Sequence, residues 1–162
     1  MLFWSGKDVR MPTPGDRPRV RADAALEQLR EAGQRLTAAR GAVLEALSGS
    51  ETHLTAAQIH RQLTARRLRL ELSTVHRTLD TLVEFGLVHA VPTATATTYG
   101  LADWAHHHAV CTSCGAIDEI AADELAAALA AAAKASRHHL DPAGTRGGLV
   151  LYGRCARCGS TS

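Results

Sequence analysis

Four cysteines in two C-x-x-C pairs are the residues of this chain with the clearest capacity for chemistry. Cys111 and Cys114 form the first pair, Cys155 and Cys158 form the second, and a glycine follows each pair. Two thiolates on a tight turn present their sulfurs at about the separation of two ligands of a tetrahedral zinc ion, and a glycine lets the backbone turn beneath the metal. A thioredoxin-like redox pair would begin a helix within a β-α-β unit, a context that neither pair has. The spacing predicts one structural Zn²⁺ held by all four cysteines.

Three consecutive histidines, His106, His107 and His108, lie just before the first cysteine pair. Successive side chains of a strand point to opposite faces, so in an extended segment His106 and His108 share one face and His107 points the other way. Two neutral imidazoles on one face can form half of a transition-metal site. A solvated polar run at a hinge is the simpler alternative, but the neighbouring cysteine pair favours the metal site.

The elements that would position these residues begin with four helices in the first half of the chain. Their starts and ends are indicated by capping residues and glycines around apolar residues at helical spacing. We expect a first helix between Ala22 and Gly33, a second from Thr37 to Gly49, a third that Thr55 opens, and a fourth from the N-cap Ser73 to Gly86. Two short strands over 87–91 and 98–101 follow. This order is typical of a winged helix-turn-helix domain.

Beyond residues 103–105, which we interpret as a hinge, the pattern changes. Strands are predicted over 109–111 and 116–120, an alanine-rich helix over 121–136, and a last strand over 149–152. A unit this small buries little core of its own. We therefore expect it to need a metal staple, a partner chain or both.

Composition and charge limit the classes of protein to consider. No apolar run approaches the roughly 20 residues that cross a bilayer, which predicts a cytoplasmic protein without a membrane partner. The net charge is +2, and the basic excess lies in the first hundred residues, where a nucleic-acid surface would have to be. The sequence has no H-E-x-x-H pattern, Gly-rich phosphate loop or Ser/His/Asp arrangement. We expect no enzymatic activity and no small organic substrate.

Four longer motifs follow one another along the chain. They are GQRLTAAR at 33–40, STVHRTL at 73–79, HHHAVCTSCG at 106–115 and LYGRCARCG at 151–159. In this order, across residues 22–160, they resemble the landmarks of the ferric uptake regulator (Fur) family. The resemblance implies a metal-responsive transcriptional repressor that acts as a homodimer. It would bind inverted-repeat operators in double-stranded DNA when a sensor metal lies between its two domains.

The fold class predicted from these signals is α+β. An N-terminal winged helix-turn-helix domain is followed by a small α/β dimerisation domain with a structural zinc held by the four cysteines. We expect a flexible arm over residues 1–20, the DNA-binding domain over 21–102, the hinge at 103–105 and the zinc-stapled dimerisation domain over 106–162.

The resemblance also implies a sensor-metal site. His53, His106 and His108 match histidine ligands of the family, and His89 stands where zinc-sensing relatives have an acidic ligand. Iron-type members have a glutamate on the strand before the histidines, where this chain has Gly100. Four imidazoles favour Zn²⁺, with Ni²⁺ next, whereas iron(II) and manganese(II) suit oxygen ligands. We therefore predict regulatory Zn²⁺ or Ni²⁺, and we expect no peroxide-sensing iron site, because that site needs a carboxylate that the sequence does not place.

A second, accessory metal site is incomplete in this sequence. Of the family's ligands at that site only His107 remains. Glu124, His138 or His139 could join it only through a shift in geometry. His107 and Glu124 are therefore candidate ligands of an accessory metal.

Five residues are candidates for contacts with DNA. On a helix that starts at residue 73, Thr74, His76 and Arg77 point away from the apolar stripe and would enter the major groove. Arg77 could bind guanine O6 and N7 or hold a phosphate. The resemblance implies that Arg35 reaches the minor groove, and Arg40 could hold a phosphate. The alternative is that these are solvated surface residues.

Two further functions would use the same scaffold. The protein could be a zinc-stabilised DNA-binding regulator without metal sensing, in which the histidines are only structural. It could also sense another signal. The metal dependence of DNA affinity distinguishes the first of these from a metal sensor.

Overall fold

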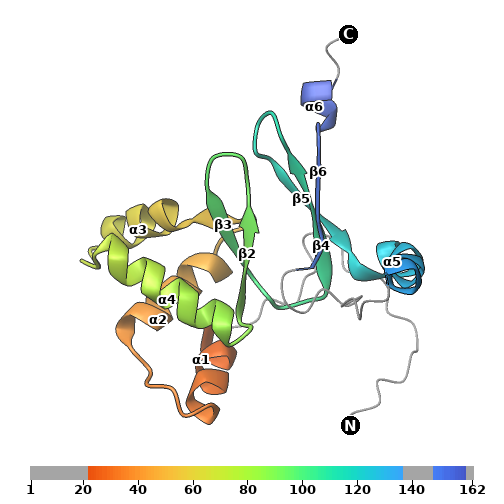
Figure 1. Cartoon of the computed structure of the whole chain (residues 1–162). Helices are drawn as coiled ribbons and strands as arrows, with labels where there is room; N and C mark the ends of the chain where they lie inside the picture. Colours follow the sequence, from red (N-terminus) through yellow and green to blue (C-terminus); the bar gives the residue numbers. More distant parts are fainter. Residues whose placement is uncertain (1–21, 137–147, 160–162) are drawn as a thin grey trace.

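The computed structural model describes residues 22–136 and 148–159, which form two three-stranded sheets with their helices (Figure 1). The first part contains α1 (Ala22–Glu31), α2 (Ala38–Ser48), β1 (Leu54–Thr55), α3 (Ala56–Ala65), α4 (Leu72–Glu84), β2 (Val88–Pro92) and β3 (Thr97–Leu101). The second part contains β4 (His106–Cys111), β5 (Ile117–Ala121), α5 (Ala122–Ser136), β6 (Val150–Gly153) and α6 (Ala156–Gly159). The predicted arm over residues 1–20 lies outside the described residues.

Capping residues set the starts of two helices in the first part. Thr37 and Thr55 cap α2 and α3 as predicted, because each hydroxyl accepts a hydrogen bond from a backbone N–H three residues further on. The prediction for the fourth helix was wrong by two residues. Helix α4 starts at Leu72, since the Glu71 carbonyl already accepts the first helical hydrogen bonds, and Ser73 is an exposed residue of the first turn.

The core of the first part is aliphatic. Its fully buried side chains come from all four helices and include Leu29, Val43, Leu44, Ile59, Leu63, Val75, Leu79 and Leu82. Burial of each contributes about 1.5–3 kcal/mol, and in α4 it fixes which face of the helix remains in solvent. The strands follow the order β1-β3-β2, all antiparallel. The sequence did not predict β1, because two residues are too few to show a period.

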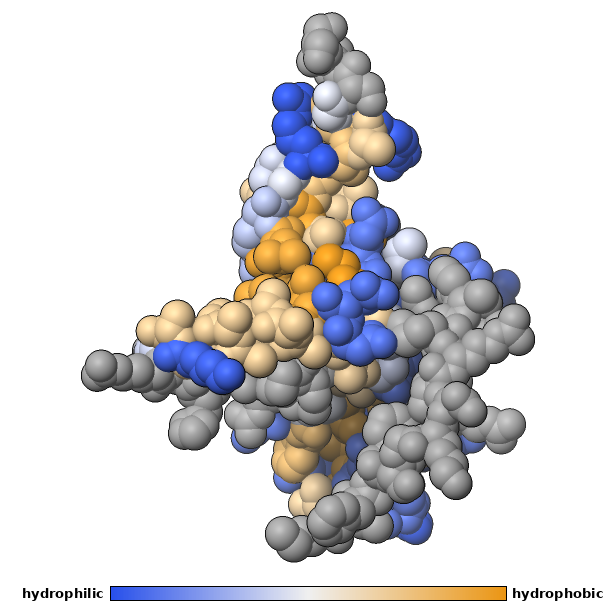
Figure 2. All heavy atoms as spheres, turned by 90° about the vertical axis from the view of Figure 1, so that its right-hand side faces the viewer, coloured by the Kyte–Doolittle hydropathy of each residue, from blue (hydrophilic) through white to orange (hydrophobic). Residues whose placement is uncertain are grey.

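The second sheet has the order β5-β4-β6, with β4 antiparallel to β5 and parallel to β6. Strand β4 begins at His106 rather than at residue 109, so it contains all three consecutive histidines. Helix α5 buries none of its side chains. Leu149, Leu151 and Tyr152 are exposed at β6. Figure 2, which faces the side of the molecule on which α5 lies in Figure 1, shows a patch of apolar surface. Among the described residues, no helix has the length and apolarity needed to span a bilayer.

Candidate metal centres and the DNA-reading face

The four cysteines converge as the spacing predicts. Their Sγ atoms all lie within 4.8 Å of one another, and the Sγ atoms of Cys114 and Cys155 are 3.8 Å apart. Four sulfurs at about 2.3 Å from one zinc ion would be about 3.8 Å from each other in a tetrahedron. The donor set and its spacing therefore fit a structural zinc.

Backbone geometry brings the two cysteine pairs together. The parallel pairing of β4 and β6 places Cys111 opposite Gly153, so the segments that follow both strands meet. Gly115 has φ +71° and closes the first turn, donating its N–H to the Cys111 carbonyl at 2.9 Å. Gly159 makes the equivalent hydrogen bond, with its N–H donating to the Cys155 carbonyl at 2.8 Å, but it ends the short helix α6 without a positive φ.

The first thiol is poised to ionise. The backbone N–H of Cys155 lies 3.4 Å from Cys111 Sγ and donates to it. This hydrogen bond, with further ones from the N–H groups of Cys114 and Ser113, lowers the pKa of the Cys111 thiol to about 6. A metal site of this kind requires thiolates, and the fold supplies one close to neutral pH.

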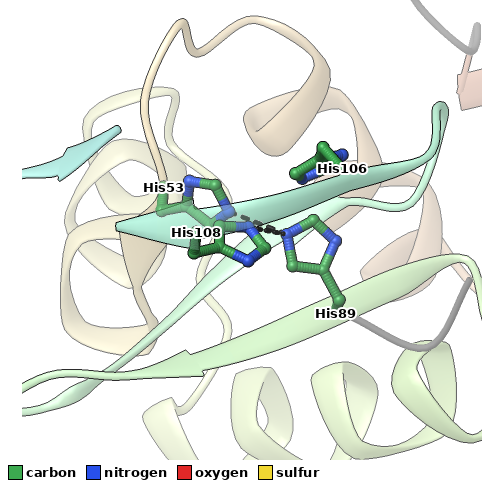
Figure 3. A group of neighbouring side chains, drawn as sticks. All are labelled: His53, His89, His106 and His108. Atoms are coloured by element: carbon green, nitrogen blue, oxygen red, sulfur yellow. Dashed lines mark hydrogen bonds between the residues drawn. The ribbon is translucent and has the colours of Figure 1, made fainter. Parts of the chain in front are cut away.

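Four histidines from three separate segments form the second cluster (Figure 3). His53 comes from the loop before β1, His89 from β2, and His106 and His108 from β4. One ring nitrogen of each lies within 4.8 Å of those of the others. His89 Nε2 is 2.8 Å from His53 Nε2 and 3.1 Å from His108 Nε2. The structure thus brings together the four histidines predicted as sensor ligands.

Burial keeps this cluster ready to bind a cation. His89, His106 and His108 are each no more than 3% exposed. Desolvation on burial, together with the adjoining imidazoles of His106, His53 and His108, lowers the pKa of His89 to about 2. A neutral imidazole offers a nitrogen lone pair, as a metal ligand must. The all-nitrogen set therefore fits Zn²⁺ or Ni²⁺.

A neighbouring residue fixes the orientation of the His106 ring. Its Nδ1–H donates to the Trp104 carbonyl at 2.9 Å, because a carbonyl oxygen can only accept. The indole of Trp104 stacks on the ring, with centroids 4.4 Å apart and planes 23° apart. The lone pair of His106 is therefore on Nε2, the nitrogen on the opposite side of the ring, as in metal-ligating histidines held by an outer hydrogen bond.

The structure adds a carboxylate that the sequence analysis missed. Glu119 Oε1 lies 3.8 Å from His53 Nδ1 and 4.0 Å from His106 Nε2. The residue is on β5, directly opposite His108 in the β4–β5 ladder. Extending the hairpin back from the first cysteine pair would have found it, had β4 been predicted to begin at residue 106. The expectation that no carboxylate can be placed beside the histidines was wrong.

His107 has a different environment from its two neighbours. It is fully buried, and its Nδ1 accepts the N–H of Leu149 at 3.0 Å. A neutral ring that accepts at Nδ1 carries its proton on Nε2, so neither nitrogen has a lone pair left for a metal. Glu124 is exposed in the first turn of α5. Neither residue joins a group of three converging donors in the described part of the chain, and residues 138 and 139 lie outside it.

The predicted DNA-reading residues lie on the solvent side of the first part. In α4, His76 and Arg77 are exposed and Thr74 is half-buried, opposite the buried Val75 and Leu79. Arg77 Nη2 lies 3.4 Å from Thr74 Oγ1, a weak contact that leaves the guanidinium accessible.

Arg35 and Arg40 have distinct environments. Arg35 is exposed in the loop before α2. Arg40 is half-buried and donates to the Arg35 carbonyl and, at 3.3 Å, to Gln34 Oε1. Arg40 therefore braces the loop that presents Arg35, a role that the sequence analysis did not identify.

A winged-helix unit with an exposed face on α4, joined to a four-cysteine unit through a buried histidine cluster, indicates a metal-responsive, DNA-binding transcriptional regulator. The match to known families agrees with this class. The chain belongs to the ferric uptake regulator family, whose model matches residues 31–142.

Individual relatives confirm the family and the fold class. The chain is 33% identical over 143 residues to the peroxide operon regulator of Bacillus subtilis (strain 168). This alignment covers 83% of this chain and 90% of the relative. The structure of the Helicobacter pylori ferric uptake regulator matches this one with a TM-score of 0.70, at 23% identity, over 87% of this chain and 96% of that chain. This match shows a similar fold. A zinc uptake regulator in complex with zinc and DNA matches with a TM-score of 0.60 at 25% identity, over 85% and 91% of the two chains. The names of these proteins refer to peroxide, iron and zinc, so the metal of this chain must be argued from its own site.

Proposed function

We propose that this protein is a repressor that binds inverted-repeat operators in double-stranded DNA as a homodimer when a metal occupies the four-histidine cluster. Zn²⁺ is the first candidate for that metal and Ni²⁺ the second, with a further Zn²⁺ held permanently by the four cysteines. One observation carries the proposal: His53 and His89 belong to the first part and His106 and His108 to the second, yet their nitrogens converge.

Each of the two sheets belongs to a part of the chain with its own proposed function. Residues 21–102 would bind DNA, residues 106–162 would hold the second copy, and residues 103–105 would act as the hinge. A metal bound by ligands from both parts fixes the angle between them, and so the separation of the two recognition helices in the dimer. Half-sites about one helical turn apart demand a defined separation. The coupling between metal and operator would then be about 1–3 kcal/mol, typical of allosteric regulators.

Exposed apolar surface supports the homodimer. Leu149, Leu151 and Tyr152 are exposed at β6, which is an edge strand of its sheet. Helix α5, which follows β5 at the other edge of the same sheet, buries no side chain against the rest of the chain. A second copy that covers this face would supply the core that the second part lacks. A DNA-binding role also implies a cytoplasmic location.

A second candidate is a regulator that senses iron(II) or manganese(II), or peroxide through such a metal. Glu119 favours it, because its carboxylate lies within 4.0 Å of two of the imidazoles and oxygen ligands suit these metals. The identity of 33% to a peroxide operon regulator agrees with it. Zinc or nickel remains the first proposal, because all four converging donors of the cluster itself are nitrogens.

The test is operator binding by protein that retains the cysteine-bound zinc but whose histidine cluster has been stripped with a mild chelator. Buffered zinc, nickel, manganese and iron(II) are titrated separately. We expect zinc to raise operator affinity at the lowest free concentration, and His106→Ala and His89→Ala to abolish that response while the cysteine-bound zinc remains. Operator affinity that is equal with and without every metal would establish the alternative of a zinc-stabilised regulator without sensing. A response to iron(II) or manganese alone would establish the second candidate.

A further inference from the structure

Gly100 lies where β3 passes against the histidine cluster. It is paired directly with His89 in the β2–β3 ladder. A Cβ at this position would lie 2.5 Å from His53 Nε2, 2.7 Å from His53 Cδ2 and 3.0 Å from His89 Nε2. Separations below 3.0 Å are essentially never found for real Cβ atoms. A side chain at residue 100 and the observed position of the His53 ring therefore exclude one another, and the contact with His89 would be tighter than almost all real Cβ contacts.

The backbone gives no reason for a glycine here. Gly100 is a regular residue of an antiparallel strand and is not among the glycines with positive φ. An alanine would fit its backbone conformation, and glycine within a strand costs stability relative to alanine. Glycine is instead required at this position because the rings of His53 and His89 occupy the space that a side chain would fill.

The two rings have little freedom to move aside. The His53 side chain is 4% exposed, its Nδ1 lies 3.8 Å from Glu119 Oε1, and its ring meets that of His108 edge-on with centroids 4.9 Å apart. The ring of His89 has centroid separations of 4.8 Å from those of both His106 and His108. A displacement large enough to relieve a contact of 2.5 Å would carry His53 Nε2 away from the point where the four nitrogens converge.

We propose that Gly100 is a specificity-determining residue of the metal site, which admits imidazoles from both His53 and His89 to one ion. The inference rests on the proposed function. Position 100 points at the same nitrogens that would bind the metal, so any side chain there would take the place of an imidazole. The residue pair at positions 89 and 100, which face each other across the ladder, therefore sets the donor atoms of the site and with them its choice of metal.

The experiment compares Gly100→Ala with Gly153→Ala. The control residue also lies in a strand, without a positive φ, and a Cβ there meets no atom within 4 Å. Zinc affinity of the histidine cluster is measured on the full chain by competition with a chromophoric chelator, and cobalt(II) absorption reports the ligand geometry. We expect Gly100→Ala to weaken zinc binding by about 10- to 100-fold, as loss of metal-site support typically does, and to change the cobalt spectrum. Gly153→Ala should match the wild type in both.

Each other outcome is decisive. Wild-type zinc affinity and an unchanged cobalt spectrum in Gly100→Ala would overturn the inference and leave the proposed function intact. A wild-type chain whose histidine cluster binds neither zinc nor nickel would overturn the proposed function and the inference with it. Should Gly100→Ala fail to fold, the substitution is repeated together with His53→Ala and His89→Ala, which remove the clashing rings. If the triple variant melts at the same temperature as the His53→Ala/His89→Ala protein, the inference is supported. If Gly100→Ala lowers stability equally in the wild type and in the His53→Ala/His89→Ala protein, the inference is refuted.

Discussion

Acid should destabilise the metal-free form of this protein through His89. The fold lowers the pKa of this imidazole from its ordinary 6.5 to about 2, first because the ring is buried and then because three other histidines adjoin it. Between these two values the unfolded chain binds a proton at residue 89 that the folded chain does not. The contribution of neutral His89 to the free energy of unfolding is therefore fully present above pH 6.5 and decreases as the pH falls below this value.

The magnitude follows from the width of that interval. Each pH unit within it costs about 1.4 kcal/mol. At pH 5, one and a half units below the ordinary value of 6.5, the loss is about 2 kcal/mol. That is a measurable fraction of a free energy of unfolding of about 5–15 kcal/mol, which is typical of single domains.

The assay is urea unfolding from pH 7.5 to pH 5 on protein that retains its cysteine-bound zinc, with zinc content measured at each pH. His89→Leu removes the buried titrating group, so its free energy of unfolding should depend on pH less steeply than that of the wild type, by about 1.4 kcal/mol per unit below pH 6.5. His76→Leu, which changes an exposed histidine of α4, should keep the wild-type slope. Parallel curves for the wild type and His89→Leu would refute the reasoning.

Three further predictions concern the other sites. Cys155→Ser should release the structural zinc and abolish dimerisation, seen by metal analysis and sedimentation, and a stable dimeric variant would contradict the four-cysteine assignment. Arg77→Ala should weaken specific operator binding by about 1–3 kcal/mol in a titration at fixed salt, whereas Arg35→Ala should lower the salt dependence of binding by about one contact. His107→Ala should cost roughly 1–3 kcal/mol of stability, because it leaves the buried N–H of Leu149 without its acceptor. His107→Asn should recover part of this loss in denaturant melts, and neither change should remove metal-dependent DNA binding.

Local signals were sufficient for much of the fold. Thr37 and Thr55 mark helix starts because a cap depends on a hydroxyl and the next three residues, all adjacent in sequence. The spacing of Cys111 and Cys114 likewise encodes a turn without reference to the rest of the chain. These features could be predicted because their causes are short-range.

The missed features depend on how segments pair. Glu119 approaches the histidines only through the register of β4 with β5, which places it opposite His108. The sequence shows that Gly100 offers no ligand, but its close approach to the imidazoles follows only from the pairing of β3 with β2, which places it opposite His89. Arg40 gains its role from the path of the preceding loop. A sequence pattern shows which face a residue occupies, whereas a ladder register depends on where a strand begins, which the sequence left uncertain by several residues.

The separation of the two cysteine pairs along the chain has a consequence for biosynthesis. The core of the first part extends to Tyr99, so a growing chain can fold helices α1 to α4 with β2 and β3 soon after that residue leaves the ribosome. The thiols of Cys155 and Cys158 emerge much later, and β6 must then insert beside β4 before zinc can find four sulfurs. Translation that stops between Cys114 and Cys155 would release a chain whose first part can fold but which has only two of the four cysteines. The supply of zinc for the four-cysteine site during synthesis therefore bears on the folding of the second part of the molecule.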